Sequence, residues 1–217
     1  MTNRLICLSG RLALVALCVV GLGAASPIMF KDNFNSSASA AHWEMVNGTW
    51  VFQKGKLIGP AENGSYTAIY VASTQSFTGD IETEVIYNQN EASNAEIVLN
   101  STGSLVNEYR VSLWSKASSF FPSRWAVQTH KNGVQGVLIP PDASDVADGT
   151  IPAPFPIPTK ARFTARRLGN TISLYVNGRK IGSVTDDDPL PAQGKVGLLV
   201  TNDTTIFDNF EVRSVRR

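Results

Sequence analysis

Residues 160–184, KARFTARRLGNTISLYVNGRKIGSV, contain three short runs in which apolar and polar side chains alternate. Two tight turns separate these runs. One is Gly169-Asn170, and the other is Asn177-Gly178, the pair that a type I′ turn prefers because both of its central residues need a positive φ. Alternation with a period of two is typical of a strand with one buried face. Residues 160–184 therefore predict three antiparallel strands joined by two hairpins.

The same pattern extends outward through most of the chain. Runs rich in Val, Ile, Thr and aromatic residues are separated by clusters of Gly, Asn, Ser and Pro, and no helical periodicity of ten residues appears after residue 25. Some dozen strands at this spacing predict an all-β fold, an antiparallel β-sandwich. The expected strands are Phe30–Asn35, Trp43–Phe52, Lys56–Gly59, Tyr66–Ala72, Asp80–Asn88, Ala95–Asn100, Glu108–Trp114, Arg124–Lys131, Lys160–Leu168, Thr171–Val176, Arg179–Val184, Lys195–Val200 and Thr205–Arg213.

Residues 138–158 interrupt this rhythm. The segment holds Pro140, Pro141, Pro152, Pro154, Pro156 and Pro158, six of the 11 prolines of the chain. Proline cannot donate to a sheet ladder, so the segment is expected to be a Pro-rich surface loop. An ordered, functional loop and a disordered insertion are both open interpretations.

The amino terminus has the features of a cleaved signal peptide. Arg4 and Arg11 precede an apolar run from Leu12 to Val20, and small residues at 23–25 suit cleavage before Ser26. The apolar run is shorter than the roughly 20 residues that span a bilayer, so a retained membrane anchor is the weaker alternative. We expect residues 1–25 to be removed and residues 26–217 to form a single secreted domain.

Charge and cysteine content narrow the class of partner. The 217 residues carry a formal charge of +1, which gives no electrostatic footprint for a nucleic acid or an anionic membrane surface. Cys7 and Cys18 are the two cysteines, and both lie in the expected signal peptide. The mature domain is therefore expected to contain no disulfide and no cysteine metal site.

Several short segments occur in a recognisable order along the chain. They are FKDNF at 30–34, Trp43, GTWV at 48–51, NGRK at 177–180, GKVGL at 194–198 and FDNFEV at 207–212. Their order resembles that of the concanavalin A-like, laminin-G-like jelly rolls of extracellular proteins. This superfamily includes lectins, carbohydrate-binding modules, glycosidases and polysaccharide lyases, so the resemblance implies two curved sheets and often a glycan ligand.

Polar side chains alternate with apolar ones on several of the expected strands. If these strands share one sheet, one surface gathers Glu84, Glu96, Arg110, Trp114, Gln128, His130, Arg162 and Tyr175. Gln128-Thr-His130 resembles the Q-x-H strand of jelly-roll alginate lyases, with Arg110 and Tyr175 as companions. The R-x-E-x-R and Y-F-K-A-G-x-Y strands of those lyases are not matched. His130, Tyr175, Arg110 and Gln128 are thus the catalytic candidates if the protein is an enzyme.

Other enzyme signatures are incomplete. The E-x-D-x-x-E strand of jelly-roll glucanases is missing, since Glu82 and Glu84 lie on one strand face without that spacing. A sugar-binding surface needs less, because aromatic rings pack on sugars and polar neighbours add hydrogen bonds. The ligand-binding candidates are Trp114, Arg110, Arg124, Gln128, Glu84, Glu96, Phe120 and Phe121.

Three functions follow as expectations. A secreted glycan-binding domain is preferred, because no complete catalytic set can be assembled. The first alternative is a polysaccharide lyase or glycoside hydrolase that uses the polar sheet face, and the second is a structural or adhesive extracellular protein without a sugar site. The expected partner is an extracellular glycan or polysaccharide, with no nucleic acid and no membrane insertion after signal cleavage. The oligomeric state is open.

Two aspartates in the first and last strands suggest a cation site. The alternation puts Asp32 on the same face as Phe34, and Asp208 on the same face as Phe210. A carboxylate facing an apolar layer needs donors or a metal. Calcium would neutralise both groups if the two strands are neighbours, as the resemblance also allows. The alternative is that each aspartate accepts hydrogen bonds from nearby backbone N–H groups.

Overall fold

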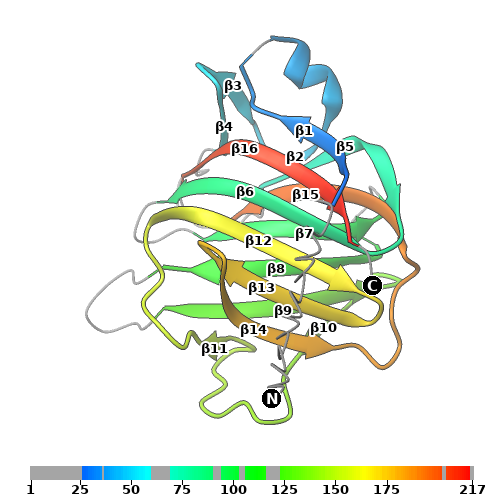
Figure 1. The fold of residues 1–217 in the computed structure, drawn as a ribbon, viewed down its shortest axis with the longest axis vertical. Helices are drawn as coiled ribbons and strands as arrows, with labels where there is room; N and C mark the ends of the chain where they lie inside the picture. Colours follow the sequence, from blue (N-terminus) through cyan, green and yellow to red (C-terminus); the bar gives the residue numbers. More distant parts are fainter. Residues whose placement is uncertain are drawn as a thin grey trace, which may run out of the picture.

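The computed structural model describes residues 26–35, 37–59, 69–89, 94–102, 106–115, 123–201 and 204–215. These residues form two eight-stranded antiparallel sheets that pack face to face, here called sheet A and sheet B. Figure 1 looks onto sheet A, with sheet B behind it. The predicted all-β sandwich is confirmed. The expected signal peptide lies outside the described residues.

Sheet A contains the three strands of residues 160–184 and the carboxy-terminal strand. Its order is β14 (Arg179–Thr185), β13 (Thr171–Val176), β12 (Lys160–Leu168), β6 (Ile81–Gln89), β16 (Thr205–Ser214), β4 (Lys56–Gly59) and β3 (Val51–Gln53), with β1 (Ile28–Asp32) paired to β16. Asn177 and Gly178 both have positive φ, as the predicted hairpin between β13 and β14 requires.

Sheet B contains the middle strands of the chain. Its order is β10 (Val134–Leu138), β9 (Arg124–Lys131), β8 (Glu108–Trp114), β7 (Ala95–Ser101), β15 (Gln193–Val200), β5 (Ile69–Thr78) and β2 (Trp43–Asn47), with β11 (Ile151–Pro152) paired to β9. A single 3₁₀ turn, η1 (Ser37–His42), precedes β2 among the described residues. No helix in the described ranges has the length and apolar character needed to cross a bilayer.

The core lies between the two sheets and draws alternate residues from both. Tyr87 and Phe163 of sheet A and Val111 and Val127 of sheet B are all fully buried. Trp43 packs edge-on against Phe210, with ring centroids 4.9 Å apart. Since successive residues of a strand point to opposite faces, the residues that precede and follow these buried residues in each strand lie on the two outer faces of the sandwich.

A β-bulge in β16 changes which side chains of that strand face the core. Pairing with β6 shifts register between Asp208 and Glu211, and Asn209 has a positive φ of 49°. Phe207 and Phe210 are both fully buried as a result, whereas the Asp208 side chain is 30% exposed and pairs with Lys56 at 3.6 Å. The predicted inward orientation of Asp208 is therefore wrong.

Asp32 is buried, as predicted, but its carboxylate is occupied by protein donors. One oxygen accepts hydrogen bonds from the Phe34 N–H at 2.7 Å and the Ser39 hydroxyl at 2.8 Å. The other accepts from the Trp43 indole N–H at 3.0 Å and lies 3.1 Å from Nδ1 of His42. Burial would raise the pKa of Asp32, but these donors together hold it below its ordinary value.

The predicted calcium site on Asp32 and Asp208 is consequently wrong, and for Asp32 the hydrogen-bonded alternative holds. The bulge turns the Asp208 carboxylate outward while the Asp32 carboxylate points inward. The hydrogen-bond donors around Asp32 stabilise its buried charge in the way that a cation would. No group of three or more His, Cys, Asp or Glu side chains that could hold a metal ion occurs in the described part of the chain.

The Pro-rich loop is attached to sheet B at several points. Within it, β11 pairs with β9, and the N–H of Ile157 donates to the Ser123 hydroxyl at 2.8 Å. The Arg124 guanidinium donates to the hydroxyl and the carbonyl of Thr150 at 2.6 and 2.7 Å, and to the carbonyl of Asp145 at 2.6 Å. These contacts favour the ordered-loop interpretation.

Candidate functional site

Sheet B carries a cluster of charged side chains on its outer face. In the register of β8 and β9, Glu108 lies opposite His130, and Arg110 follows two residues after Glu108. In the register of β7 and β8, Glu96 lies opposite Ser112, two residues after Arg110. Glu96 and His130 are therefore diagonal neighbours of Arg110, about 7–8 Å away on the two flanking strands. We call Glu96, Glu108, Arg110 and His130 the outer-face cluster.

The outer-face cluster is unusually buried for side chains that point away from the core. Glu108 is fully buried, and Glu96 is 4% exposed. One oxygen of Glu108 accepts from Nε of Arg110 at 2.6 Å and lies 3.7 Å from Nδ1 of His130. One oxygen of Glu96 accepts from the side-chain amide of Asn94.

Three polar atoms of the cluster have no hydrogen-bond partner among the described residues. They are the second carboxylate oxygens of Glu96 and Glu108 and the Nδ1 nitrogen of His130. A buried polar group without a partner costs roughly 1–3 kcal/mol, so proteins rarely keep several together without a functional reason. The cluster is therefore the strongest candidate for a ligand site in the described part of the chain.

The pKa values of Glu96 and His130, on the two sides of the cluster, are shifted in opposite directions. Burial raises the pKa of Glu96, against the opposing effects of the Arg110 charge and of nearby hydrogen-bond donors. Burial lowers the pKa of His130, the Arg110 charge lowers it further, and Glu108 partly opposes both. The cluster thus combines a carboxyl group biased toward its protonated form, a neutral imidazole and a central guanidinium, which are groups suited to acid–base chemistry.

The predicted single polar surface is wrong, because its members are divided between the two sheets. Glu84, Arg162 and Tyr175 lie on β6, β12 and β13 of sheet A, on the outer face of the opposite side of the sandwich. There Glu84 pairs with Arg162 at 3.3 Å, and Arg166 lies over the Tyr175 ring. The physical reason is that β6 pairs with β12 and β16, whereas β7 pairs with β8 and β15. Tyr175 is therefore not a companion of His130.

The other predicted site residues differ in where they lie and in whether their side chains are already engaged. Gln128 lies on the outer face of β9 opposite Arg110, and Trp114 is half-buried opposite Arg124. Arg124 is not free to bind a ligand as predicted, because its guanidinium is engaged by the Pro-rich loop. Phe120 and Phe121 lie outside the described residues.

Glu108 is a site residue that is absent from the predicted set. The alternation of the strand Glu108–Trp114 puts it on the same face as Arg110, so the signal was present in the sequence. Asn94, whose amide orients Glu96, precedes β7 and has no such periodic signal.

Comparison with known protein families gives one match that spans the sandwich. Residues 29–213 match the model of the 3-keto-alpha-glucoside-1,2-lyase-like domain. The chain belongs to this family. The matched residues of this 3-keto-alpha-glucoside-1,2-lyase-like domain include every strand that contributes to the outer-face cluster. No curated protein matches the chain.

Several solved structures have a fold similar to that of this family member. The carbohydrate-binding module CBM66 from Bacillus subtilis superposes with a TM-score of 0.61 at 19% identity, covering 80% of this chain and 96% of the module. The Bacillus licheniformis beta-glucanase superposes with a TM-score of 0.56 at 14% identity, covering 86% and 98%. A galectin-like protein of unknown function from Bacillus subtilis gives a TM-score of 0.63 at 15% identity, covering 88% and 97%.

These likenesses confirm the predicted concanavalin A-like jelly-roll fold. The family match adds a domain family whose description names a glucoside lyase, in agreement with the expected class of protein. At such low identities the solved structures carry the fold and not the chemistry.

Proposed function

We propose that this chain binds a 3-keto-α-glucoside on the outer face of sheet B and cleaves it there by elimination. The observation that supports this most strongly is the outer-face cluster. In it, Glu96 with a raised pKa and His130 with a lowered pKa lie on either side of the Arg110 guanidinium. The family match supplies the substrate class. The expected function of glycan binding is retained, and the lyase alternative is preferred to binding alone.

The chemistry of such a substrate suits the groups in the cluster. A ketone at C3 of the glucose ring makes the proton at C2 acidic, because the resulting carbanion is delocalised onto the ketone oxygen as an enolate. A base that removes this proton therefore prepares the bond between C1 and the glycosidic oxygen for cleavage. The parent glucoside without the ketone lacks this acidity.

His130 is the proposed general base. Its lowered pKa keeps the imidazole neutral near pH 7, and its unpartnered Nδ1 can accept the C2 proton. Glu108, 3.7 Å from that nitrogen, would stabilise the imidazolium that forms. Glu108 is thus a positioning residue that holds both His130 and Arg110.

Arg110 and Glu96 complete the proposed reaction. Arg110 would stabilise the negative charge that develops on the ketone oxygen. The electron pair of the enolate then forms the C1–C2 double bond as the C1–oxygen bond breaks, and the leaving oxygen takes a proton from the Glu96 carboxyl. The raised pKa of Glu96 favours the protonated form that this step needs. The products are a free aglycone and an unsaturated 3-keto sugar, and no oxidant or reductant is consumed.

A paired incubation tests the proposal. The purified mature chain is mixed with the 3-keto derivative of methyl α-glucoside and, separately, with methyl α-glucoside itself. We expect methanol release and enone absorbance from the first compound only. His130→Ala and Glu96→Gln should each reduce the rate by about 10²-fold or more, whereas Glu84→Gln, a carboxylate on the outer face of sheet A, should leave it unchanged.

Sugar binding without cleavage is the second candidate. The pairing of Arg110 with Glu108 favours it, because a guanidinium held in this way is a ready donor to sugar hydroxyls. Binding of the parent glucoside to the wild-type chain, with no product from the 3-keto compound, would replace the proposed reaction by this function. Failure to bind either compound or any glycan on an array would leave the structural or adhesive alternative.

We also propose that the protein is exported and meets its glycoside outside the cytoplasm. The basic residues Arg4 and Arg11, the apolar run that follows and the small residues at 23–25 support this. Amino-terminal sequencing of secreted material is expected to begin at Ser26. Retention of residues 1–25 in a membrane fraction would contradict it.

A further inference from the structure

Asn94, the residue directly before β7, is fastened to the connection between the two sheets. It is fully buried. Its side-chain oxygen accepts the backbone N–H of Thr201 at 2.7 Å, and its backbone carbonyl accepts the hydroxyl of Thr205 at 2.9 Å. Thr201 follows β15 of sheet B, and Thr205 begins β16 of sheet A. Asn94 is therefore held where the chain passes from one sheet to the other.

These contacts decide which way the Asn94 amide points. A backbone N–H can only donate, so the atom that meets Thr201 is the side-chain oxygen and not the nitrogen. The nitrogen then points to Glu96 and donates to its Oε1 atom. An exchange of the two ends of the amide would put a donor against a donor at Thr201, so the Thr201 contact fixes the orientation.

The orientation of Asn94 also fixes where a proton on Glu96 can lie. The side-chain nitrogen of Asn94 carries hydrogens and no acceptor, so Oε1 of Glu96 has to act as the acceptor of this pair. A proton on the carboxyl group is therefore placed on Oε2. That oxygen is buried and has no hydrogen-bond partner among the residues that the structure describes.

The other groups that face Glu96 come from the flanking strands. Glu96 lies opposite Ser112 of β8 and opposite Leu199 of β15. Burial raises the pKa of Glu96, the Arg110 charge opposes this, and the Glu108 charge adds to it. Asn94 adds a neutral donor, which stabilises the carboxylate less than a second cation would. Asn94 thus orients Glu96 without forcing it to lose its proton.

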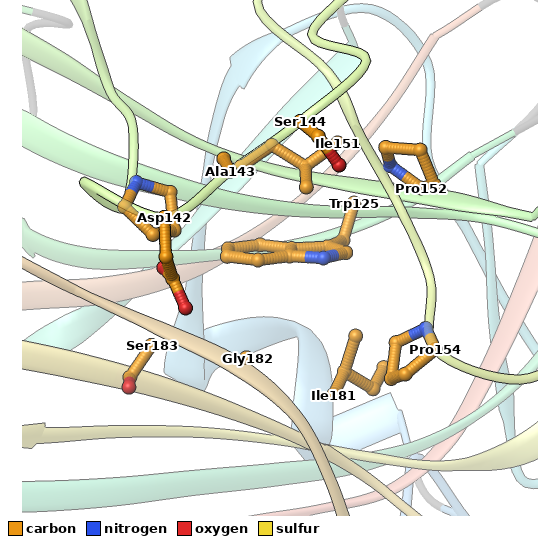
Figure 2. A pocket seen from close by; sticks show the side chains of 11 residues that line it. Trp125, Asp142, Ala143, Ser144, Ile151, Pro152, Pro154, Ile181, Gly182 and Ser183 are labelled. Carbon is orange, nitrogen blue, oxygen red and sulfur yellow. The ribbon is translucent and has the colours of Figure 1, made fainter.

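The cavity under the Pro-rich loop does not supply another group to Glu96. Its volume is about 380 Å³, and Figure 2 shows Trp125 of β9 in its wall, with Asp142 toward one end of the ring. None of the residues that line it belongs to β7 or to the outer-face cluster. Asp142, the carboxylate in this wall, therefore borders a different space from Glu96.

We infer that Asn94 is the positioning residue for proton transfer from Glu96 to the leaving group. This inference rests on the proposed elimination, in which the Glu96 carboxyl protonates the oxygen that departs from C1. Because Asn94 occupies Oε1, the proton is delivered from Oε2, and the leaving oxygen has to approach that atom. The O–H bond of the carboxyl group breaks as the C1–oxygen bond breaks, and the Asn94 amide then donates to the carboxylate that remains.

A change of leaving group tests this role. The wild type and Asn94→Ala are incubated with the 3-keto derivatives of methyl α-glucoside and of 4-nitrophenyl α-glucoside. Methanol has to be protonated as it leaves, whereas 4-nitrophenolate is stable enough to leave without a proton. We expect methanol release to fall about 10²-fold in Asn94→Ala, because the acid is misplaced, and 4-nitrophenol release to stay close to the wild-type rate.

Two further variants separate positioning from a structural role. Thr205→Val removes the hydroxyl that donates to the Asn94 carbonyl but leaves the side-chain amide in place. It should lower the melting temperature without a selective loss of methanol release. Asn94→Asp keeps an acceptor for the Thr201 N–H but puts a second carboxyl group beside Oε1 of Glu96. The two carboxyl groups then share a proton between them, so methanol release should fall as it does in Asn94→Ala.

The pH dependence gives a readout that a structural role would not move. The reaction needs protonated Glu96, and the Asn94 donor favours the charged form. Removal of this donor should therefore move the alkaline limb of the pH profile for methanol release to higher pH in Asn94→Ala. The same shift is expected without substrate, in an NMR titration of the ¹³C-labelled Glu96 carboxyl group assigned from Glu96→Gln, and Thr205→Val should not show it.

The outcomes distinguish this inference from the proposed elimination. An equal loss of methanol and 4-nitrophenol release in Asn94→Ala, the same selective loss in Thr205→Val, or an unmoved Glu96 titration in folded Asn94→Ala would each overturn the inference. A wild-type chain that releases neither product would instead refute the elimination. A Glu96 titration that still moves in Asn94→Ala would then show that Asn94 orients this carboxyl group for another purpose.

Discussion

Replacement of Arg110 by glutamine should raise the pKa of His130. Arg110 Nε and His130 Nδ1 contact the same Glu108 oxygen at 2.6 and 3.7 Å, so the two nitrogens are no more than about 6.3 Å apart. At that distance two unit charges repel by about 0.7 kcal/mol in water and about 2.6 kcal/mol at an effective dielectric constant of 20. Without Arg110, the affinity of the imidazole for a proton should therefore rise roughly threefold to ninetyfold.

The chain suits this measurement because it has two histidines. An NMR titration of the imidazole C–H signals follows His130 directly, and His42, which contacts Asp32 in the 3₁₀ turn beside β2, serves as the internal reference. Arg110→Lys keeps the positive charge and should leave the His130 titration close to that of the wild type. A His130 titration that is unmoved or shifted to lower pH in Arg110→Gln, in a protein that stays folded, would refute the proposed electrostatics.

Three further predictions concern stability and the Pro-rich loop. Asp32→Ala leaves buried donors unpaired and should lower the free energy of unfolding at pH 7 by about 3 kcal/mol. Because the pKa of Asp32 is lowered in the fold, this contribution to stability is present above pH 3.8 and is lost as pH falls through the lowered pKa. Denaturation of the wild type and the variant at pH 7 and at low pH measures both effects. Arg124→Ala removes the side-chain attachment of the Pro-rich loop at Asp145 and Thr150 and should speed proteolysis within residues 138–158 while far-UV circular dichroism is unchanged; equal cleavage rates would contradict this. Gly182→Ala forces a methyl group against Trp125 and should destabilise the fold by about 1–3 kcal/mol in urea unfolding, and a neutral effect would show that the indole is free to move.

The strands were predictable because alternation is a local property of the sequence. The runs on either side of Asn177-Gly178 are strands with the expected turn between them. Asn132-Gly133 is a second pair of the same kind, with positive φ at both residues and strands on either side. The sequence contains that signal, yet β10 is absent from the predicted strands. It follows Lys131 directly and begins with an exposed valine, Val134.

The partners of each strand were not predictable in the same way. Alternation tells which residues share a face of one strand, but it does not tell which sheet the strand joins. Glu84 and Glu96 are separated by 12 residues in the chain and lie on different sheets, because the chain crosses the sandwich between β6 and β7. For this reason the residues that were predicted to share one polar surface lie on two different sheets.

Local irregularity produced the other error. One additional residue in β16, with Asn209 in the left-handed region, exchanges the inward and outward sides of the strand. Asp208 consequently faces away from the core, and the two-aspartate site does not form. By contrast, Glu108 could have been placed from the alternation around Arg110, since β8 is regular over its whole length.

The central claim is that His130 removes the proton at C2 of a 3-keto-α-glucoside, and proton exchange at that carbon tests it most directly. A 3-keto sugar without a leaving group at C1 (1,5-anhydro-3-keto-glucitol) is incubated with the protein in D₂O, and its C2 proton signal is followed by NMR. The account predicts that the wild-type chain accelerates loss of this signal above the buffer rate and that His130→Ala does not. An unaccelerated rate with the wild-type chain, or equal acceleration by the His130→Ala variant, would contradict it.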